Sequence, residues 1–194
     1  MEKLAHRLQR LRWPHPHETA RRLIMASETP ANMLMTLLDN LGLDAPPMAF
    51  ADRLRRWRGL HTQSDFRIVA DAQDMLTTLN GRYRLAVVTT RGQAEAKAFL
   101  SQHNLNGFFE ILVTRESTWR LKPHPAPIRH AAQLLDVPVE QCVMVGDTTV
   151  DVKSARRAGA WAVAVLCGFG ERAELERASA HVILEHTSHL SSLL

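Results

Sequence analysis

The sequence is poor in cysteine and lacks long apolar runs, repeats and low-complexity stretches. Among its 194 residues the only cysteines are Cys142 and Cys167, and no Cys/His spacing is of the zinc type. No apolar run approaches the roughly 20 residues of a membrane-spanning helix, and no signal peptide is visible. We therefore expect a cytoplasmic protein with reduced thiols and no membrane partner. At 45% hydrophobic, the chain can bury one good core.

Positive charge is concentrated in the first part of the chain. Residues 1–60 hold ten Lys/Arg against six Asp/Glu, which accounts for the whole net charge of +4. Such a segment could contact nucleic acid. However, no aromatic or groove-reading pattern accompanies Arg53, Arg55, Arg56 and Arg58, so we interpret them as a solvated helix face and expect no nucleic-acid partner.

The same segment carries a helical pattern only. Leu4, Leu8 and Leu11 recur at helical spacing. The prolines of Pro14–His17 interrupt the pattern, and the two histidines there are more typical of a surface turn than of a metal site. We predict a helical domain over residues 1–64.

From about residue 66 strand and helix patterns alternate, which predicts an α/β domain over residues 65–194. Right-handed crossovers would make it a doubly wound, mostly parallel sheet. We predict strands at 85–88, 111–113, 142–145, 161–166 and 181–184. Helices are expected at 69–79, at 93–104, around 128–135, and before Gly159, which stops the last of them.

Two carboxylates follow the strand predicted at Cys142–Val145. This unbroken apolar run favours a strand buried on both faces. Gly146 permits a sharp turn, Asp147 then lies past the carboxyl end of the strand, and Asp151 follows four residues later. Converging carboxylates suit a hard cation such as Mg²⁺. They would equally suit a helix N-cap at Asp147 and a solvated first-turn acid at Asp151.

Two further strand-end sites are expected on the same edge of the sheet. Thr89 and Thr90 offer hydroxyls and N–H groups at a helix start, which is a ready anion site, although Thr89 could be an ordinary N-cap. Lys122 supplies a positive charge in a proline-rich loop, where it could also be a solvated lysine. Hydroxyl, ammonium and Mg²⁺ together are typical of a site that holds a phosphoryl group and stabilises its transfer.

The order of these segments resembles the haloacid dehalogenase (HAD) superfamily, chiefly its phosphoglycolate-phosphatase-like branch. Leu85–Arg91 is similar to the second signature of that superfamily, Leu121–Pro125 to the third and Val145–Asp151 to the fourth. Val165–Gly170 resembles the loop that follows in the phosphatase branch. The resemblance extends over essentially the whole chain.

The resemblance implies a Mg²⁺-dependent phosphomonoesterase that works through a phosphoaspartyl enzyme. Thr89, Thr90, Arg91 and Lys122 would bind the phosphate, and Lys122 would also neutralise charge on the nucleophile. Asp147 would ligate Mg²⁺, and Asp151 would position Lys122 or a metal-bound water, or join Asp147 as a metal ligand. The resemblance makes residues 1–64 a helical cap that closes over the substrate.

One feature of the superfamily is missing from the sequence. Its first signature, an apolar strand ending in Asp-x-Asp-x-Thr, should precede the cap and supply the nucleophile. The nearest acidic pair, Asp71 and Asp74, is three apart in a helical pattern, and Asp39 and Asp44 belong to helix ends. The central strand of the sheet, between the strands at 85–88 and 142–145, would then be missing too. We expect the chain to lack upstream residues, through a misplaced start or a truncation.

Two functions are compatible with this pattern. The first is a phosphatase of small phosphorylated metabolites, of the 2-phosphoglycolate type, in which the chain as written is inactive because it has no phosphoryl acceptor. The second is a non-catalytic HAD-like protein that uses Thr89, Lys122 and Asp147 to bind a phosphorylated ligand or a partner. A weaker third hypothesis makes residues 1–60 a nucleic-acid-binding unit. The pattern indicates no particular oligomeric state.

Overall fold

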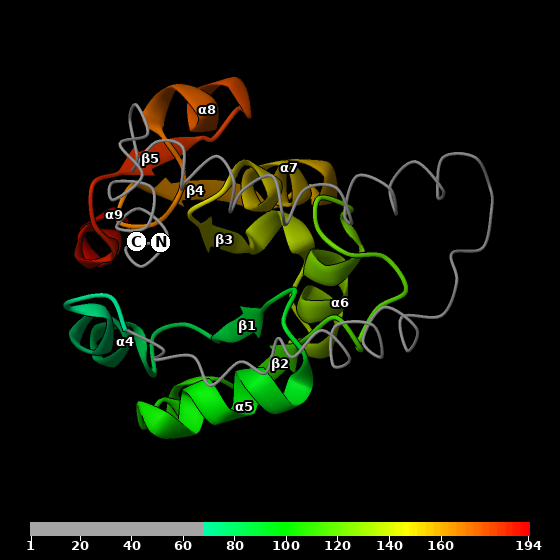
Figure 1. Cartoon of the computed structure of the whole chain (residues 1–194), viewed down its shortest axis with the longest axis vertical. Coiled ribbons are helices and arrows are strands. Elements are labelled where there is room, and N and C mark those ends of the chain that lie inside the picture. Colours follow the sequence, from blue (N-terminus) through cyan, green and yellow to red (C-terminus); the bar gives the residue numbers. More distant parts are fainter. Residues whose placement is uncertain (1–67) are drawn as a thin grey trace, which may run out of the picture. The chain divides into compact units, whose positions relative to one another are not determined.

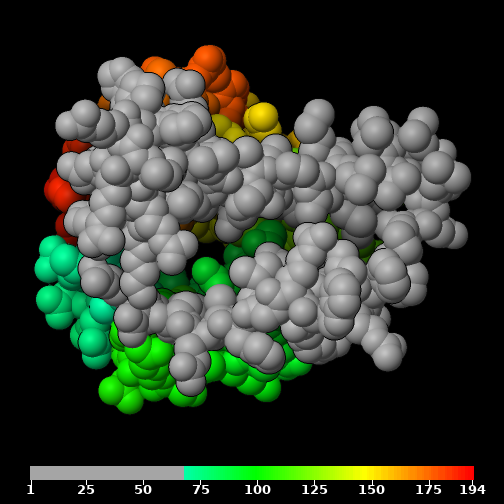
Figure 2. All heavy atoms as spheres, in the orientation of Figure 1, coloured from blue at the N-terminus to red at the C-terminus, as the bar shows by residue number. Residues whose placement is uncertain are grey.

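The computed structural model describes residues 68–194, which are the coloured parts of Figure 1 and Figure 2. The chain divides into two units, Met1–Asp65 and Phe66–Leu194. The predicted helical cap over residues 1–64, with its Pro14–His17 turn and basic segment, lies outside the described residues. The fold below is that of the second unit.

Helices and strands alternate along the described residues, as predicted. Each predicted strand is found within two residues of its expected position. The strands are β1 (Ala86–Val88), β2 (Ile111–Val113), β3 (Val143–Gly146), β4 (Trp161–Val165) and β5 (Val182–Leu184). The α-helices are α4 (Ala72–Leu79), α5 (Gln93–Gln102), α6 (Ala126–Leu134), α7 (Thr149–Ala158), α8 (Arg172–Arg177) and α9 (Leu190–Leu193), and the 3-10 turns are η1 (Asn106–Phe108), η2 (Val139–Gln141) and η3 (Thr187–His189).

All of the strand pairs within residues 68–194 are parallel, and they form two separate sheets. In the first sheet β1 pairs with β2, with Val87 opposite Leu112. In the second the order is β3-β4-β5, with Val145 opposite Val163. Within residues 68–194, neither β1 nor β3 has a second strand paired along its other edge.

Helices cover both faces of the strands, which makes the fold doubly wound. Successive residues of β1 face opposite layers: Val87 packs against a cluster that includes Leu76 of α4 and Leu100 of α5, and Val88 packs against a cluster that includes Val152 of α7. This period of two is the side-chain alternation of a strand. Figure 1 shows α5 along the β1–β2 pair and α7 beside β3 and β4.

Burial differs sharply between β3 and β4. Ala162–Val165 of β4 are at most 5% exposed, whereas Val143 of β3 is 37% exposed and the rest of β3 is half-buried. The prediction of a strand buried on both faces is therefore wrong for the Cys142–Val145 run. β4 has a strand on each side, but β3 is an edge strand among the described residues, so fewer neighbours enclose its side chains.

Helix ends follow the local signals in the sequence, with small shifts. α7 stops where Gly159 adopts the left-handed conformation (φ 94°), as predicted. α5 ends two residues before the predicted Asn104, which has a φ of 55° and so cannot continue a right-handed helix. α4 begins at Ala72, three residues later than predicted, because Asp71 is left-handed (φ 62°).

None of the helices in residues 68–194 combines the length and the apolar character needed to cross a bilayer.

Candidate active site

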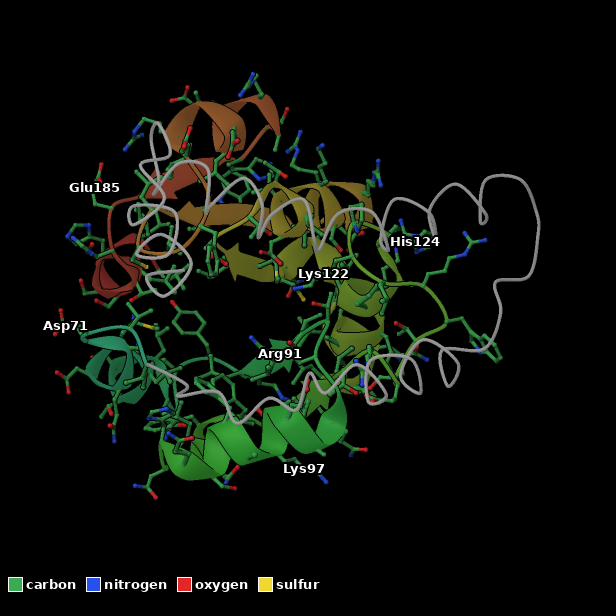
Figure 3. The ribbon with its side chains drawn as sticks, in the orientation of Figure 1. Asp71, Arg91, Lys97, Lys122, His124 and Glu185 are labelled. Atoms are coloured by element: carbon green, nitrogen blue, oxygen red, sulfur yellow. The ribbon has the colours of Figure 1, made fainter. Side chains whose placement is uncertain are left out.

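Lys122 is one of the few charged residues that are buried in the described unit. Its Nζ donates hydrogen bonds to the carbonyl oxygen of Val88 at 3.0 Å and to Asp151 Oδ1 at 2.6 Å. The side chains of Lys122 and Asp151 are each only 10% exposed. Figure 3 shows Lys122 in the interior of the unit, whereas Lys97 and Glu185 lie at its periphery. Lys122 is therefore not a solvated loop lysine.

Asp151 is held on both carboxylate oxygens. While Oδ1 accepts from Lys122, Oδ2 accepts from the backbone N–H of Thr148 at 3.2 Å and from its hydroxyl at 2.7 Å. Thr148 is the N-cap of α7 and forms a capping box with Asp151. The alternative that Asp147 caps this helix is wrong, and Asp151 is not a solvated acid.

Gly146 makes room for this arrangement at the end of β3. A Cβ atom on Gly146 would lie 2.3 Å from Asp151 Cβ and 2.6 Å from its Cγ. Contacts between carbon atoms normally begin near 3.5 Å. The strand can therefore pass this close to Asp151 only because residue 146 has no side chain.

Asp147 is held by a different segment, the loop after β4. Its Oδ2 accepts a hydrogen bond from the N–H of Phe169 at 2.9 Å, and its carbonyl oxygen accepts one from the N–H of Gly170 at 2.8 Å. Among the described residues no hydrogen bond reaches Oδ1 of Asp147. One oxygen of this half-buried carboxylate is thus fixed and the other is available.

Thr89 lies at the end of β1, directly after the residue that accepts from Lys122. Its N–H donates to the carbonyl oxygen of Val113 at 2.9 Å, which extends the β1–β2 ladder by one bond. Its hydroxyl oxygen accepts from the N–H of Arg91 at 3.1 Å. Thr89, Thr90 and Arg91 therefore form a tight turn between the strand and α5.

The start of α5 itself is occupied by carboxylates. α5 begins at Gln93, as predicted, and its N-cap is Gly92, so Thr89 is not an N-cap. The N–H of Gly92 donates to Glu95 Oε2 at 3.3 Å, and the N–H of Gln93 donates to Glu116 Oε2 at 3.0 Å. The prediction that Thr89 and Thr90 present N–H groups of a helix start is corrected: they precede it, and acidic side chains already satisfy these two N–H groups.

Glu116 is suited to this position because its environment favours the anion. Burial alone would raise the pKa of its carboxyl. Hydrogen bonds from the Thr114 hydroxyl (2.8 Å) and from backbone N–H groups, with the nearby charge of Arg115, outweigh this and hold the pKa below its usual value. An anion at the amino end of α5 also interacts favourably with the helix dipole.

The residues predicted for the site gather where β1 and β3 end. Lys122 joins the two ends directly, through Val88 on one side and Asp151 on the other. Thr89 follows Val88 and Asp147 follows Gly146, so both lie at this edge of the strands. Two of the three N–H bonds of the Lys122 ammonium have partners among the described residues, which leaves one for a further acceptor.

The oxygen ligands that this site offers fit a divalent cation only in part. Mg²⁺ prefers oxygen ligands and is often held by one or two carboxylates, with water and phosphate oxygens completing its shell. The available Oδ1 of Asp147 suits this role, whereas both oxygens of Asp151 are already engaged. Within residues 68–194 no group of three or more His, Cys, Asp or Glu side chains could hold a metal ion.

Several residues of this arrangement were missed by reasoning from the sequence. Thr148 could have been found, since Thr148 and Asp151 have the spacing of a capping box. The hydrogen bonds from Phe169 and Gly170 to Asp147 had no such signal beyond two closely spaced glycines. No signal in the sequence indicated the contact of Glu116 with α5.

Comparison with known proteins identifies the family. Residues 10–165 match the family described as haloacid dehalogenase-like hydrolase, which is more than half of the chain. The chain belongs to the haloacid dehalogenase-like hydrolase family. The second, third and fourth signatures noted in the sequence all begin within the matched residues.

Individual relatives of this HAD-like chain are phosphatases by name. It is 48% identical over 77 residues to the phosphoglycolate phosphatase (plasmid) of Cupriavidus necator, a match that covers 40% of this chain and 33% of that protein. It is 34% identical over 112 residues to pyrophosphatase PpaX of Bacillus mycoides, covering 58% of this chain and 52% of the relative. The chain thus spans between a third and about half of the length of these relatives.

A solved structure supports the HAD-like fold. The crystal structure of a predicted phosphoglycolate phosphatase from Haemophilus somnus 129PT matches with a TM-score of 0.65, covering 80% of this chain and 71% of the other. Sequence identity is 19%, so this likeness shows the fold alone. The predicted α/β fold of HAD type is confirmed.

Proposed function

We propose that this chain provides the phosphate-holding and charge-neutralising part of a Mg²⁺-dependent phosphomonoester hydrolase. The observation that carries the proposal is Lys122, a buried ammonium held between the ends of β1 and β3 by Val88 and Asp151. A buried cation with one N–H left for another acceptor is suited to an anion such as a phosphoryl group. The family and the names of the relatives support the same chemistry.

Each site residue has a distinct part in this proposal. Thr89 and the N–H of Thr90, with Arg91 beside them, bind phosphoryl oxygens. Lys122 neutralises charge that develops as the phosphoryl group is transferred, and its burial strengthens this interaction. Asp151 accepts a hydrogen bond from Lys122 and holds the ammonium in place. Asp147 holds Mg²⁺ through its available oxygen, and Mg²⁺ supplies positive charge to the phosphate when bound.

Covalent transfer of a phosphoryl group requires a nucleophile, and the unpaired edges of β1 and β3 are consistent with a position for it. β1 and β3 each form only parallel pairs, and their second edges are unpaired among the described residues. Their side chains are half-buried, except that of Val143, which is exposed. A further parallel strand along these edges would bring its carboxyl end to Lys122. Pairing would satisfy backbone groups that cost about 1–3 kcal/mol each when buried without partners. We propose that this strand carries the aspartate that forms the phosphoaspartyl enzyme.

The substrate is proposed to be a small phosphorylated metabolite. The two relatives point to different members of this class, since one is named for phosphoglycolate and the other for pyrophosphate. The higher identity is to the phosphoglycolate phosphatase, so we place 2-phosphoglycolate first. As part of the same proposal, residues 1–64 form the cap over this substrate.

The test compares this chain with a version completed by fusion to an apolar strand ending in Asp-x-Asp-x-Thr. Hydrolysis of p-nitrophenyl phosphate, 2-phosphoglycolate and pyrophosphate is measured with Mg²⁺ and with EDTA. The expected result is Mg²⁺-dependent hydrolysis of 2-phosphoglycolate by the completed protein only. A matched fusion in which the first aspartate is replaced by asparagine should be inactive, because the phosphoryl acceptor is gone.

The same assay separates the proposal from a non-catalytic role. Hydrolysis of pyrophosphate in preference to both monoesters would move the substrate to the second relative's class. If the completed protein folds and hydrolyses none of the three compounds, the phosphatase proposal is wrong and a role in binding phosphorylated ligands is favoured.

A further inference from the structure

The loop between β4 and α8 is built around Asp147. Two consecutive residues of the loop donate backbone hydrogen bonds to this aspartate, Phe169 to its side chain at 2.9 Å and Gly170 to its carbonyl oxygen at 2.8 Å. The loop is itself anchored, because Leu166 donates to the carbonyl oxygen of Leu184 at 2.9 Å as it leaves β4. One short segment therefore binds both the side chain and the backbone of Asp147.

The two glycines of this loop are required for space and not for backbone conformation. A Cβ on Gly168 would lie 2.0 Å from Asp147 Oδ2 and 2.4 Å from its Cβ and Cγ. A Cβ on Gly170 would lie 2.4 Å from the carbonyl oxygen of Asp147. Among the described glycines only Gly81 and Gly159 have positive φ. The backbone of Gly168 is therefore outside the left-handed region that favours glycine, and a side chain at this position would leave no room for the carboxylate.

Not every glycine of this unit carries such a constraint. Gly107, which is exposed in the 3-10 turn η1, has a negative φ, and nothing lies within 4 Å of a Cβ placed on it. The close approach at Gly168 is thus specific to the contact with Asp147. It also gives a matched control, since Gly107→Ala adds the same methyl group where there is space.

We propose that Gly168 and the N–H of Phe169 are positioning elements for the Asp147 carboxylate: they fix Oδ2 and leave Oδ1 directed to a divalent cation. The proposal rests on the proposed function, in which Asp147 holds that cation. Neither Gly168 nor Phe169 touches the cation or the substrate; each acts through Asp147. Groups that orient a metal ligand typically change metal affinity 10–100-fold when they are altered.

The first measurement tests the contact without any cation. Urea unfolding midpoints are compared for Gly168→Ala in the native background and in an Asp147→Gly background, where Cβ, Cγ and Oδ2 are absent. We expect Gly168→Ala to lower the midpoint in the native background and to lower it much less in the second. An equal loss in both backgrounds would overturn the proposal, because the loop would then require glycine for reasons unrelated to Asp147.

The second measurement tests the role in positioning. Mn²⁺, a paramagnetic probe for the Mg²⁺ site, is titrated into the full chain, and free Mn²⁺ is followed by electron paramagnetic resonance. We expect the wild type and Gly107→Ala to share one dissociation constant and Gly168→Ala to raise it by about tenfold or more. Wild-type affinity in a folded Gly168→Ala protein would overturn the proposal.

Failure of the proposed metal role of Asp147 can be told apart from failure of the positioning role of Gly168 and Phe169. If the wild type and Gly107→Ala bind no Mn²⁺, the metal role of Asp147 in the proposed function is wrong, and so is the directing of Oδ1 to a cation. The unfolding comparison would then still decide whether the loop fixes the carboxylate. If the wild type binds Mn²⁺ and Gly168→Ala binds it equally well, the metal role stands and the positioning role fails.

Discussion

Lys122 Nζ lies 2.6 Å from Asp151 Oδ1, and both side chains are 10% exposed. Arg172 and Glu185 form an ion pair of the same length, 2.6 Å, with side chains 49% and 61% exposed. The two pairs therefore differ in burial far more than in distance. Burial removes water that would screen the charges and also removes the water that would solvate a partner left alone.

This contrast predicts different costs for isosteric substitutions. Asp151→Asn leaves the Lys122 ammonium buried without its counter-ion and should lower the free energy of unfolding by roughly 3 kcal/mol. Glu185→Gln, the matched change in the exposed pair, should cost less than about 1 kcal/mol. Urea unfolding with a common m-value measures both. Equal small losses would mean that the buried pair contributes no more than a surface pair.

The capping box of α7 predicts a smaller, separate effect. Thr148→Ala removes the hydroxyl that donates to Asp151 Oδ2 at 2.7 Å and accepts from the Asp151 N–H at 3.4 Å. The expected loss is about 1 kcal/mol, within the usual range for an N-cap. Thr148→Ser keeps the hydroxyl and should retain most of the stability in a thermal unfolding experiment. A serine variant as unstable as the alanine variant would argue against the cap.

His181 predicts how stability changes with pH. Its ring stacks on Trp161 with centroids 4.1 Å apart, and burial and then the positive charge of Arg156 lower the pKa of His181 from its ordinary value. Below about pH 6.5 the unfolded chain takes up a proton that the folded ring resists. The contribution of His181 is therefore complete above that pH and is lost as the pH falls below it toward the folded pKa.

The measurement is urea unfolding between pH 7.5 and 5.5. His181→Gln should lose less stability across this interval than the wild type, since the titrating group is gone. Arg156→Gln should raise the pKa of His181 in an NMR titration of the ring, because one of the two causes of the shift is removed. A pH dependence that is the same in His181→Gln and the wild type would show that the ring does not titrate as described.

The proposed chemistry predicts the effect of removing the Lys122 charge. In the strand-completed protein, Lys122→Met should lower kcat about 10²–10³-fold, the usual loss for a group that stabilises charge in the transition state. Lys97→Met, on the exposed face of α5, should leave kcat unchanged. Initial rates at saturating substrate and Mg²⁺ provide the comparison. A Lys122→Met enzyme with wild-type kcat would remove Lys122 from the reaction.

What the sequence predicted well was local. Apolar runs marked the strands, and Gly159 marked the end of α7, because these signals depend on residues close together in the chain. The burial of Lys122 was not predictable in this way, since its partner Asp151 is 29 residues away. The β3 strand was predicted to be more buried than it is, because burial depends on neighbouring strands and not on the apolar run itself.

In the candidate site, too, local features were predictable from the sequence and long-range contacts were not. Thr89, Lys122 and Asp147 were expected at one edge of the sheet from strand positions alone, and Lys122 does join the ends of β1 and β3. The hydrogen bond from Phe169 to Asp147 joins residues that are 22 apart in the chain, so only the folded structure reveals it. The carboxylates at the start of α5 were missed for a similar reason, since Glu116 reaches Gln93 across 23 residues.

The central claim is that Thr89, Lys122 and Asp147 surround one phosphate-sized site. Titration of inorganic phosphate with Mg²⁺ into the ¹⁵N-labelled chain, followed by NMR, tests it most directly. The account predicts saturable shifts of the Thr89, Thr90 and Asp147 amides with a single dissociation constant, which weaken together in Lys122→Met. Saturable shifts confined to other residues, or no shift at these three, would contradict it.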